Sequence, residues 1–257
     1  MLPIIAFLFF TIGFFLDWKG SRLNLFDFLI LRVSLVYSRL WHRWQSNRVA
    51  PFPRDRPCLV ACNHTCSTDP MYILAACDYP IGFVVAHEHF RLNAFTHWVL
   101  AGIGSVPVRR GGNDPTALRR IMRRLEEGRI LCLFPEGNLS NVRRGRLGHA
   151  RLGIGYLALK TGLPVYPVYV HGGPRTDRLL PTWLFLTRRA AKAFFGKPVD
   201  LADLRHQPMT RKTIAEATHR VMDAIAALAP PQGESVAPDP VDDRARRRRK
   251  ARRGLMP

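Results

Sequence analysis

The sequence predicts an α/β protein in which a sheet is flanked by helices and is preceded by an N-terminal pair of membrane-associated helices. Two observations support a folded domain of this class. Short apolar runs alternate with longer amphipathic segments after residue 57, which is typical of a mainly parallel sheet covered by helices. The chain also has 257 residues, of which 47% are hydrophobic, enough for one full core with appendages at each end.

The N-terminal helices are predicted from the first apolar stretch. Residues 2–16 are apolar and uncharged. As a helix this stretch is about 22 Å long, which is shorter than the roughly 30 Å hydrocarbon core of a bilayer. It lacks a basic start and a small-residue cleavage site, so a secretory signal is disfavoured. We expect an anchor that enters one leaflet.

Residues 23–45 are expected to form a second helix. Polar side chains recur at helical spacing and make one stripe on a wide apolar surface that ends in Trp41, Arg43 and Trp44. This pattern fits a helix in the membrane interface and a helix packed on the core about equally well. Its place directly after an apolar anchor favours the membrane. Residues 1–48 are therefore predicted to form a helical hairpin that rests in one leaflet.

Residues 49–230 are predicted to form the catalytic domain. Strands are expected at 58–62, 82–86, within 105–109, at 130–134 and at 165–170. Helices are expected at 69–76, from 115 to Gly128, at about 150–161 and at 210–228, with Pro70 and Pro115 at first helical positions and Thr210 as an N-cap. In such a sheet, active residues lie on the loops after the strands. Residues 231–257 are predicted to be a disordered basic tail.

The formal net charge of +20 indicates an anionic partner. The run RARRRRKARR at 244–253 holds only part of this charge, so the folded part is basic as well. Nucleic acid, an anionic bilayer and a phosphorylated substrate are the candidates. The 5 cysteines are an odd number in mostly apolar surroundings, which fits reduced thiols in a protein that faces the cytoplasm.

The segment that follows the first strand, Asn63 to Asp69, contains residues suited to acid–base chemistry. A histidine such as His64 can take a proton from an alcohol. A carboxylate such as Asp69 can hold the ring in one tautomer and stabilise the imidazolium. The acceptor hydroxyl can then be the nucleophile itself. The alternative is structural, with Asp69 capping the helix at Pro70 and His64 as a polar turn residue.

Three further segments follow in order and change this balance. They are Gly104 to Arg110 (GSVPVRR), Phe134 to Ser140 (FPEGNLS) and Leu163 to Val168 (LPVYPV). Together with Asn63, His64 and Asp69 they make four ordered blocks, and over residues 58–170 the chain resembles the lysophosphatidate acyltransferase family of glycerolipid acyltransferases. The resemblance implies transfer of an acyl group from acyl-CoA or acyl-carrier protein to the hydroxyl of 1-acylglycerol-3-phosphate. It also implies that His64 is the base and Asp69 its orienting partner.

The resemblance also implies the substrate-binding residues, with one departure. The third block commonly reads Glu-Gly-Thr-Arg, whereas here Glu136 and Gly137 are followed by Asn138 and Leu139. The arginine expected to contact the acceptor phosphate is therefore replaced. The candidates to supply this contact are Arg143, Arg144 and Arg146 in the following loop, or Arg109 and Arg110 of the second block. A solvated basic loop is the alternative for Arg143 to Arg146. Arg151 matches a basic position that the family often shows, and a surface arginine on a helix explains it nearly as well.

The expected set of partners is a lysophospholipid acceptor, an acyl thioester donor and the bilayer, with no bound cofactor. Cys58, Cys62, Cys66 and His64 lie close in sequence, but no second cluster accompanies them and no metal is expected. The expected location is the cytoplasmic face of the cell membrane. One alternative is an acyltransferase for another lysophospholipid or an amino-acid-derived lysolipid. The other is a non-catalytic basic protein that binds membranes or nucleic acid, which the intact His64, Asp69 and Glu136 disfavour.

Overall fold

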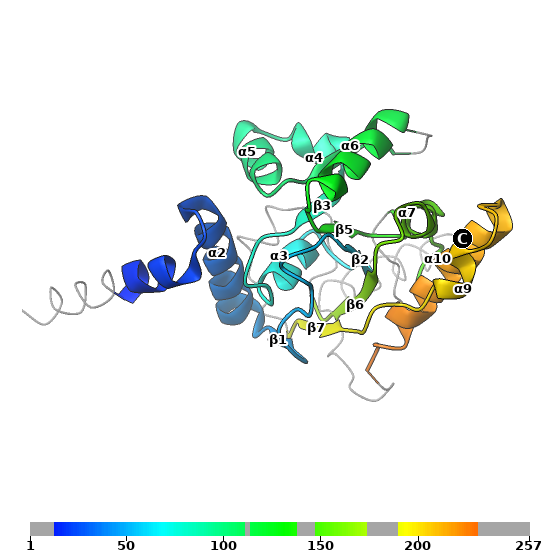
Figure 1. Ribbon diagram of the computed structural model, residues 1–257. Helices are drawn as coiled ribbons and strands as arrows, with labels where there is room; N and C mark the ends of the chain where they lie inside the picture. Colours follow the sequence, from blue (N-terminus) through cyan, green and yellow to red (C-terminus); the bar gives the residue numbers. More distant parts are fainter. Residues whose placement is uncertain (1–12, 111–113, 138–146, 174–189, 231–257) are drawn as a thin grey trace, which may run out of the picture.

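The computed structural model describes residues 13–110, 114–137, 147–173 and 190–230, and at its centre is a seven-stranded sheet (Figure 1). The strand order is β1-β7-β6-β2-β5-β3-β4. Neighbouring strands are parallel, except that β6 and β7 are antiparallel. The strands are β1 (Gln45–Ser46), β2 (Leu59–Cys62), β3 (Gly82–Ala86), β4 (Val106–Val108), β5 (Leu131–Leu133), β6 (Val165–His171) and β7 (Lys192–Phe195). The predicted α/β class is confirmed.

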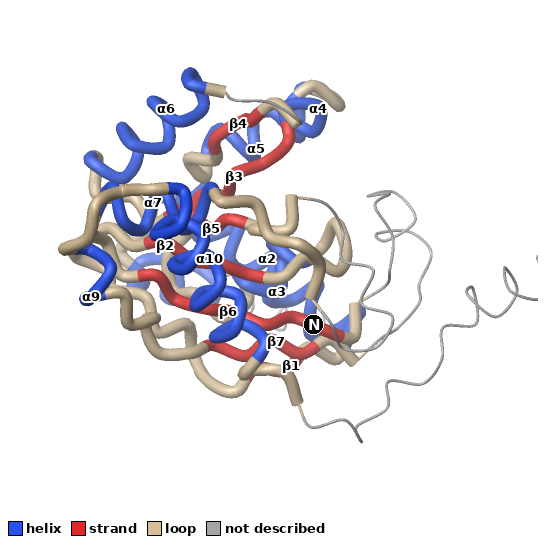
Figure 2. Tube along the Cα trace, turned by 90° about the vertical axis from the view of Figure 1, so that its right-hand side faces the viewer, coloured by secondary structure: helices blue, strands red, loops and turns tan. Residues whose placement is uncertain are grey.

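Helices cover both faces of this sheet. Helices α2 and α3 lie behind the strands in Figure 2, and α7 and α10 lie in front of them. Helices α4, α5 and α6 surround the edge formed by β3 and β4 (Figure 1). The helices are α2 (Leu25–His42), α3 (Asp69–Leu74), α4 (His87–Phe90), α5 (Ala94–Gly102), α6 (Pro115–Glu126), α7 (Gly153–Thr161), α9 (Ala202–Arg205) and α10 (Arg211–Ala226).

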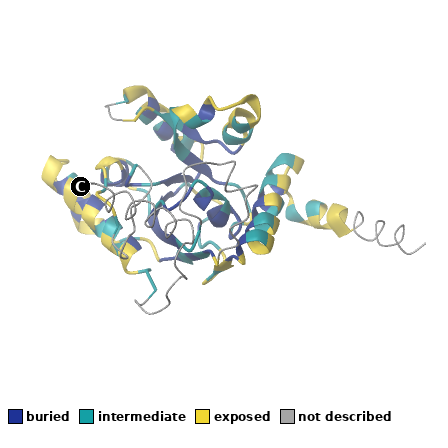
Figure 3. Ribbon diagram, turned by 180° about the vertical axis from the view of Figure 1, so that it is seen from behind, coloured by how far each residue is buried: buried dark blue, intermediate teal, exposed yellow. Residues whose placement is uncertain are grey.

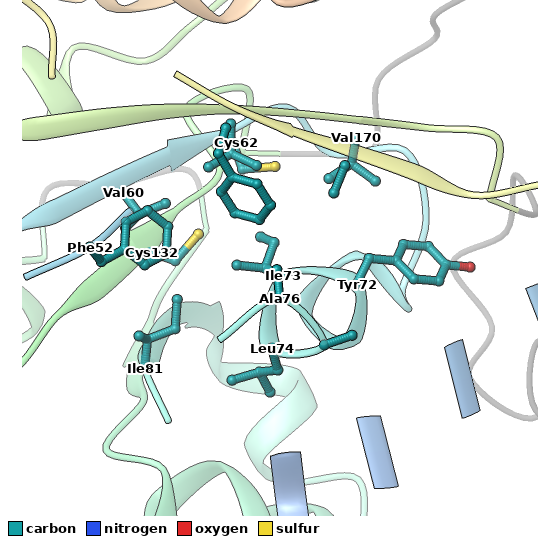
Figure 4. Close-up of a cluster of buried hydrophobic side chains, with 14 of the residues drawn as sticks. Phe52, Val60, Cys62, Tyr72, Ile73, Leu74, Ala76, Ile81, Cys132 and Val170 are labelled. Carbon is teal, nitrogen blue, oxygen red and sulfur yellow. The ribbon is translucent and has the colours of Figure 1, made fainter. Parts of the chain in front are cut away.

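The core has two layers, one on each face of the sheet. Strand β2 contributes Val60 and Cys62 to the layer beneath α3, and Leu59 and Ala61 to the layer beneath α7 and α10. Figure 4 shows Val60 and Cys62 gathered with Ile73 of α3. A parallel strand that is buried on both faces reads as a continuous apolar run. This is why the predicted strands at 58–62, 82–86, 130–134 and 165–170 correspond closely to β2, β3, β5 and β6.

Local signals also set the ends of the main helices as predicted. Asp114 caps α6 by accepting a hydrogen bond from the Ala117 backbone N–H. Thr210 caps α10 by accepting one from the Thr213 N–H. After α6 the chain turns at Gly128, whose φ of +79° is easily adopted without a side chain. These caps satisfy backbone N–H groups that the helix itself leaves without partners.

Helix α2 has its polar stripe against the protein and much of its apolar surface outward. The side chains of Ser34, Ser38 and His42 are buried, and Phe28 and Leu31 join them. Leu25, Leu29, Val33, Val36 and Leu40 are exposed. In Figure 3 the strands are mostly dark blue (buried), whereas the outer faces of the helices are teal or yellow (intermediate or exposed). In the N-terminal helix before α2, Phe14 contacts Phe28 edge-on, and Asp17 pairs with Arg32 at 2.7 Å.

The predicted membrane hairpin is not supported by the structure as a membrane element. Within the described ranges, no helix is at once long enough and apolar enough to cross a bilayer. Residues 1–12 and the predicted tail at 231–257 lie outside the described residues.

Some elements were not predicted. Strand β1 is only two residues long and polar, and β7 alternates between buried and half-buried positions. Helix α5 has no fully buried residue, so its sequence lacks a clear apolar stripe. The second predicted helix, at 23–45, is shorter than expected, because Arg43 adopts a left-handed conformation with φ of 44° and ends α2 at His42.

Candidate active site

The candidate site is built on the loop that connects β2 to α3. Asn63 begins this loop and is fully buried. Its amide nitrogen donates to the Val170 carbonyl at 2.8 Å, and its amide oxygen accepts from the Val170 N–H at 2.7 Å. Asn63 was predicted to bind substrate. The structure places its amide between β2 and β6, where it fixes the position of the residue that follows, and substrate binding by Asn63 stays a prediction.

The structure brings His64 and Asp69 into direct contact. His64 Nδ1 lies 2.9 Å from Asp69 Oδ2. The Asp69 side chain is fully buried, whereas that of His64 is 22% exposed. An ionised carboxylate only accepts hydrogen bonds, so Nδ1 is the donor and Nε2 is left to accept a proton. The ring nitrogen suited to act as a base is thus the one that does not face Asp69.

The Asp69 carboxylate is held by the loop itself. One oxygen accepts from the backbone N–H groups of Thr65 and Cys66, and the other accepts from the Thr65 hydroxyl at 2.9 Å and the Cys66 thiol at 3.0 Å. Burial, reinforced by the Asp69 charge, raises the pKa of the Cys66 thiol, so it stays protonated and donates. The carboxylate accepts no bond from α3 in these contacts, and Thr68 is the N-cap position of that helix. The geometry therefore favours the acid–base interpretation over a helix cap.

The loop after β5 supports His64 from the other side. The Phe134 ring stacks on the His64 ring, with centroids 4.1 Å apart and planes at 24°. The Glu136 carboxylate, 7% exposed, accepts from the His64 backbone N–H at 3.3 Å and from the Gly148 N–H at 2.7 Å. Glu136 thus joins the β2 loop, the β5 loop and the approach to α7. The role of Phe134 was not predicted, because a phenylalanine at the end of an apolar run reads as part of the strand.

Gly137 is required by its conformation and by its neighbour. Its φ is +67°, a left-handed value that side chains with a Cβ adopt at a cost. A Cβ placed there would also lie 2.7 Å from Arg151 Nε. The Arg151 backbone N–H in turn donates to the Pro135 carbonyl at 2.8 Å. The third block and the segment before α7 are therefore in close contact.

A groove of about 1140 Å³ opens beside His64. Its apolar walls come from Leu29 and Val33 of α2, Phe95 and Trp98 of α5, and Ile121 of α6. Small-molecule sites are typically about 300–1,000 Å³ and mainly apolar. This groove is larger, which suits a long and flexible apolar ligand.

The predicted arginines are only partly described. Arg109 and Arg110 follow β4 and line the groove, and the Arg109 backbone N–H donates to Asp114 at 3.0 Å. Asn138, Arg143 and Arg144 lie outside the described residues. Within the described ranges, no three His, Cys, Asp or Glu side chains are grouped as metal ligands. Cys58 and Cys62 are buried in the core beneath α3.

The chain is similar to several curated acyltransferases. A 1-acyl-sn-glycerol-3-phosphate acyltransferase of Bacillus subtilis is 24% identical over 181 residues, which cover 68% of this chain and 83% of the relative. A chloroplastic enzyme of the same name from Brassica napus is 29% identical over 167 residues, covering 57% of this chain and 46% of the relative. The chain thus spans about half the length of some relatives. A lyso-ornithine lipid O-acyltransferase of Pseudomonas aeruginosa is 30% identical over 148 residues, covering 54% of this chain and 55% of the relative.

The fold is likewise shared with a solved structure. The crystal structure of the 1-acyl-sn-glycerophosphate acyltransferase PlsC from Thermotoga maritima superposes with a TM-score of 0.54 at 21% identity, covering 89% of this chain and 94% of that one. The acyltransferase family model matches residues 45–171, a span that includes His64, Asp69 and Glu136. The similarity to the acyltransferase family model thus covers residues 45–171, just under half of the chain.

Proposed function

We propose that this protein is a membrane-associated enzyme that moves a fatty acyl group from an acyl thioester to the free hydroxyl of 1-acylglycerol-3-phosphate. One observation carries the proposal. The His64–Asp69 pair, 2.9 Å apart, opens onto a large apolar groove that arginines also line. The curated relatives named for this reaction support it.

The proposed reaction uses the acceptor hydroxyl as its nucleophile. Unprotonated His64 Nε2 takes the hydroxyl proton while the oxygen attacks the thioester carbonyl carbon. Asp69 stabilises the imidazolium that forms. When the tetrahedral intermediate collapses, the carbon–sulfur bond breaks and the thiolate leaves, taking the proton from His64. The products are the new ester and the free thiol, and no step requires a bound cofactor or metal.

The groove fits the two parts of such a substrate. Its apolar walls from α2, α5 and α6 match an acyl chain, and burying a chain there is favourable by about 0.8 kcal/mol per CH₂ group. Arg109 and Arg110, which also line the groove, match a phosphate, because a guanidinium donates parallel hydrogen bonds to phosphate oxygens. The donor is either acyl-CoA or acyl-carrier protein, both of which carry negative charge that suits this basic chain.

A second candidate acceptor is an amino-acid-derived lysolipid. The observation that favours it is the 30% identity with a lyso-ornithine lipid O-acyltransferase. Leu139 standing where the lysophosphatidate family commonly has an arginine points the same way. Rates with lysophosphatidate and with lyso-ornithine lipid, measured with the same acyl-CoA, decide between the two acceptors.

We place the protein on the cytoplasmic face of the cell membrane. The support is the exposed apolar surface of α2, which is continuous with the groove through Leu29 and Val33. An acyl chain entering from a bilayer would then reach His64 without crossing water. A membrane face of this kind is also consistent with the exposed aromatic residues Phe95 and Trp98 of α5.

The test of the proposed chemistry is His64→Ala. We expect the rate of acyl transfer to lysophosphatidate to fall by about 10²–10⁴-fold, while the variant stays folded because the four donors of Thr65 and Cys66 still hold the buried Asp69 carboxylate. His219 offers a matched control, since it pairs with Asp223 at 3.1 Å on the exposed face of α10. His219→Ala should keep full activity. If His64→Ala transfers acyl groups at the wild-type rate, the proposed mechanism is wrong.

A further inference from the structure

We infer that Arg151 binds the phosphate of the lysolipid acceptor and so takes over the role of the arginine that the sequence of the third block lacks. This inference rests on the proposed function and names a residue of its acceptor site. The observation behind it is the contact between Arg151 and Gly137. A Cβ at position 137 would lie 2.7 Å from Arg151 Nε and 3.2 Å from Cζ, so the guanidinium lies against the bare backbone of the third block.

The position of Arg151 is fixed by a backbone hydrogen bond and by the helix that follows it. Its backbone N–H donates to the Pro135 carbonyl at 2.8 Å, which ties it to the start of the same block. It also precedes α7 by two residues, and α7 is held in the core through Ile154 and Leu157. The side chain is exposed, but the fold fixes the Arg151 backbone, and the guanidinium lies over Gly137. A phosphate site needs this kind of placement, because orientation determines how well a guanidinium fork fits two oxygens.

Arg151 is connected to the proposed catalytic pair through a few direct contacts. Gly137 directly follows Glu136, whose carboxylate accepts from the His64 backbone N–H. Arg151, Gly137 and His64 all line the same groove. In 1-acylglycerol-3-phosphate, the free hydroxyl and the phosphate are on adjacent carbons of the glycerol. An acceptor with its hydroxyl at His64 must therefore have its phosphate nearby, on the side where cationic groups are available.

The Arg151 guanidinium is available for an anion. Several other arginines of the described ranges are engaged by carboxylates, as Arg124 is by Glu127 and Arg220 by Asp203. Among the described residues, no carboxylate forms an ion pair with Arg151. Arg109 and Arg110 also line the groove, but the contact that the structure records there involves the Arg109 backbone and not a guanidinium. Arg151 is thus the described arginine whose side chain is held in place at the third block.

A phosphate at Arg151 has two possible sources, because acyl-CoA carries phosphates as well. The adjacency to Glu136 and His64 favours the acceptor. The two sources separate in steady-state kinetics, since the KM for lysophosphatidate reports on one and the KM for acyl-CoA on the other. A cation that binds the phosphate equally in the ground state and the transition state affects KM and leaves kcat nearly unchanged.

The experiment uses the full chain with Arg151→Gln and Arg151→Lys. In Arg151→Gln, the KM for lysophosphatidate should rise about ten- to hundredfold, because charge-assisted hydrogen bonds are lost. The kcat and the KM for acyl-CoA should change by less than about threefold. Arg151→Lys should show a smaller rise, since it keeps the charge and loses the fork. Arg211→Gln, at the start of α10 and exposed, is the matched control and should behave as the wild type.

The outcomes separate this inference from the proposed function. If the wild type does not acylate lysophosphatidate at all, the proposed acceptor is wrong. If the wild type is active and Arg151→Gln keeps its KM for lysophosphatidate, the role of Arg151 is wrong. A rise confined to the KM for acyl-CoA also overturns it, because the phosphate would then belong to the donor. Melting temperatures of the variants establish that each is folded, as expected for an exposed side chain.

Discussion

The Asp69 carboxylate is fully buried, and four donors of Thr65 and Cys66 surround it in addition to His64. A buried charge without such partners costs several kcal/mol. The four donors offset that cost and also fix the orientation of the carboxylate, so that the oxygen nearest to His64 is determined by the loop. The short segment from Asn63 to Asp69 thus contains both members of the proposed acid–base pair and most of what positions them.

Asp69→Asn tests this arrangement at a single atom. The amide nitrogen would face donors in place of an accepting oxygen, and the amide would no longer hold the His64 tautomer. We expect kcat to fall by about 10²–10⁴-fold, as for other acid–base pairs of this kind. The melting temperature should also fall, because buried donors lose a partner. Asp223→Asn, in the exposed pair with His219, is the control. A kcat within threefold of the wild type would contradict the role of Asp69.

At the scale of secondary structure, the elements found from the sequence are those with strong local signals. Strands β2, β5 and β6 are apolar runs that are buried on both faces, and β3 is an apolar run whose first two residues are buried. Helices α6 and α10 begin at recognisable caps. The elements missed have weak local signals. Strand β7 exists because β6 pairs with it across many residues of sequence, and α5 has no buried stripe.

Long-range packing also explains why a glycine stands at position 155, which its local sequence does not show. A glycine inside a helix usually costs stability. Here a Cβ on Gly155 of α7 would lie 2.4 Å from the Ile214 carbonyl oxygen of α10. The glycine therefore allows α7 and α10 to approach closely over β6. Such contacts depend on how two distant helices pack, which residue patterns alone do not determine.

The cap of α6 predicts a pH dependence of stability. Hydrogen bonds from the Ala117 and Arg109 backbone N–H groups lower the pKa of Asp114. A carboxyl whose pKa is lower in the folded state stabilises the protein above its unfolded pKa of about 4, and this stabilisation is lost as the pH falls through the folded value. Asp114→Ala should therefore unfold at a lower urea concentration than the wild type at pH 7. At pH 3 the difference should shrink.

Asp114→Asn is the control for the charge in this experiment. An asparagine keeps one oxygen, which can accept the capping hydrogen bond from the Ala117 backbone N–H, and it has no proton to gain. Its cap should therefore not titrate between pH 7 and pH 3. A gap between the wild type and Asp114→Ala that stays constant across this range would contradict the linkage to the Asp114 charge.

At the scale of the whole molecule, the site forms because parallel strands end at the same edge of the sheet. The ends of β2, β4 and β5 carry His64, Arg109 and Glu136 respectively, and this gathering follows from the predicted topology. The groove could not be predicted in the same way. Its walls depend on how α2 and α5 pack beside the sheet, as in the edge-on contact of Phe26 with Trp98 at 4.7 Å. The buried polar stripe of α2 likewise appears only when the helix is docked.

The outward apolar surface of α2 leads to a prediction about the membrane. Val36 and Leu40 are exposed and do not line the groove. If this surface enters a bilayer, the double variant Val36→Gln and Leu40→Gln should bind vesicles containing phosphatidylglycerol at least tenfold more weakly than the wild type, because fully burying each such side chain contributes about 1.5–3 kcal/mol. The melting temperature without vesicles should not fall, because neither side chain is in the core. Sedimentation with vesicles measures the binding.

The matched control for this experiment is Met209→Gln. Met209 is another exposed apolar side chain, but it lies just before α10, a helix that is on the opposite side of the sheet from α2 (Figure 2). It should leave vesicle binding unchanged. If the α2 double variant binds vesicles as tightly as the wild type, its apolar surface does not mediate membrane association. Acyl transfer to lysophosphatidate dispersed below its aggregation limit should be retained in the double variant, because the groove and the His64–Asp69 pair are untouched. The surface that meets the bilayer and the site of the reaction can in this way be tested separately.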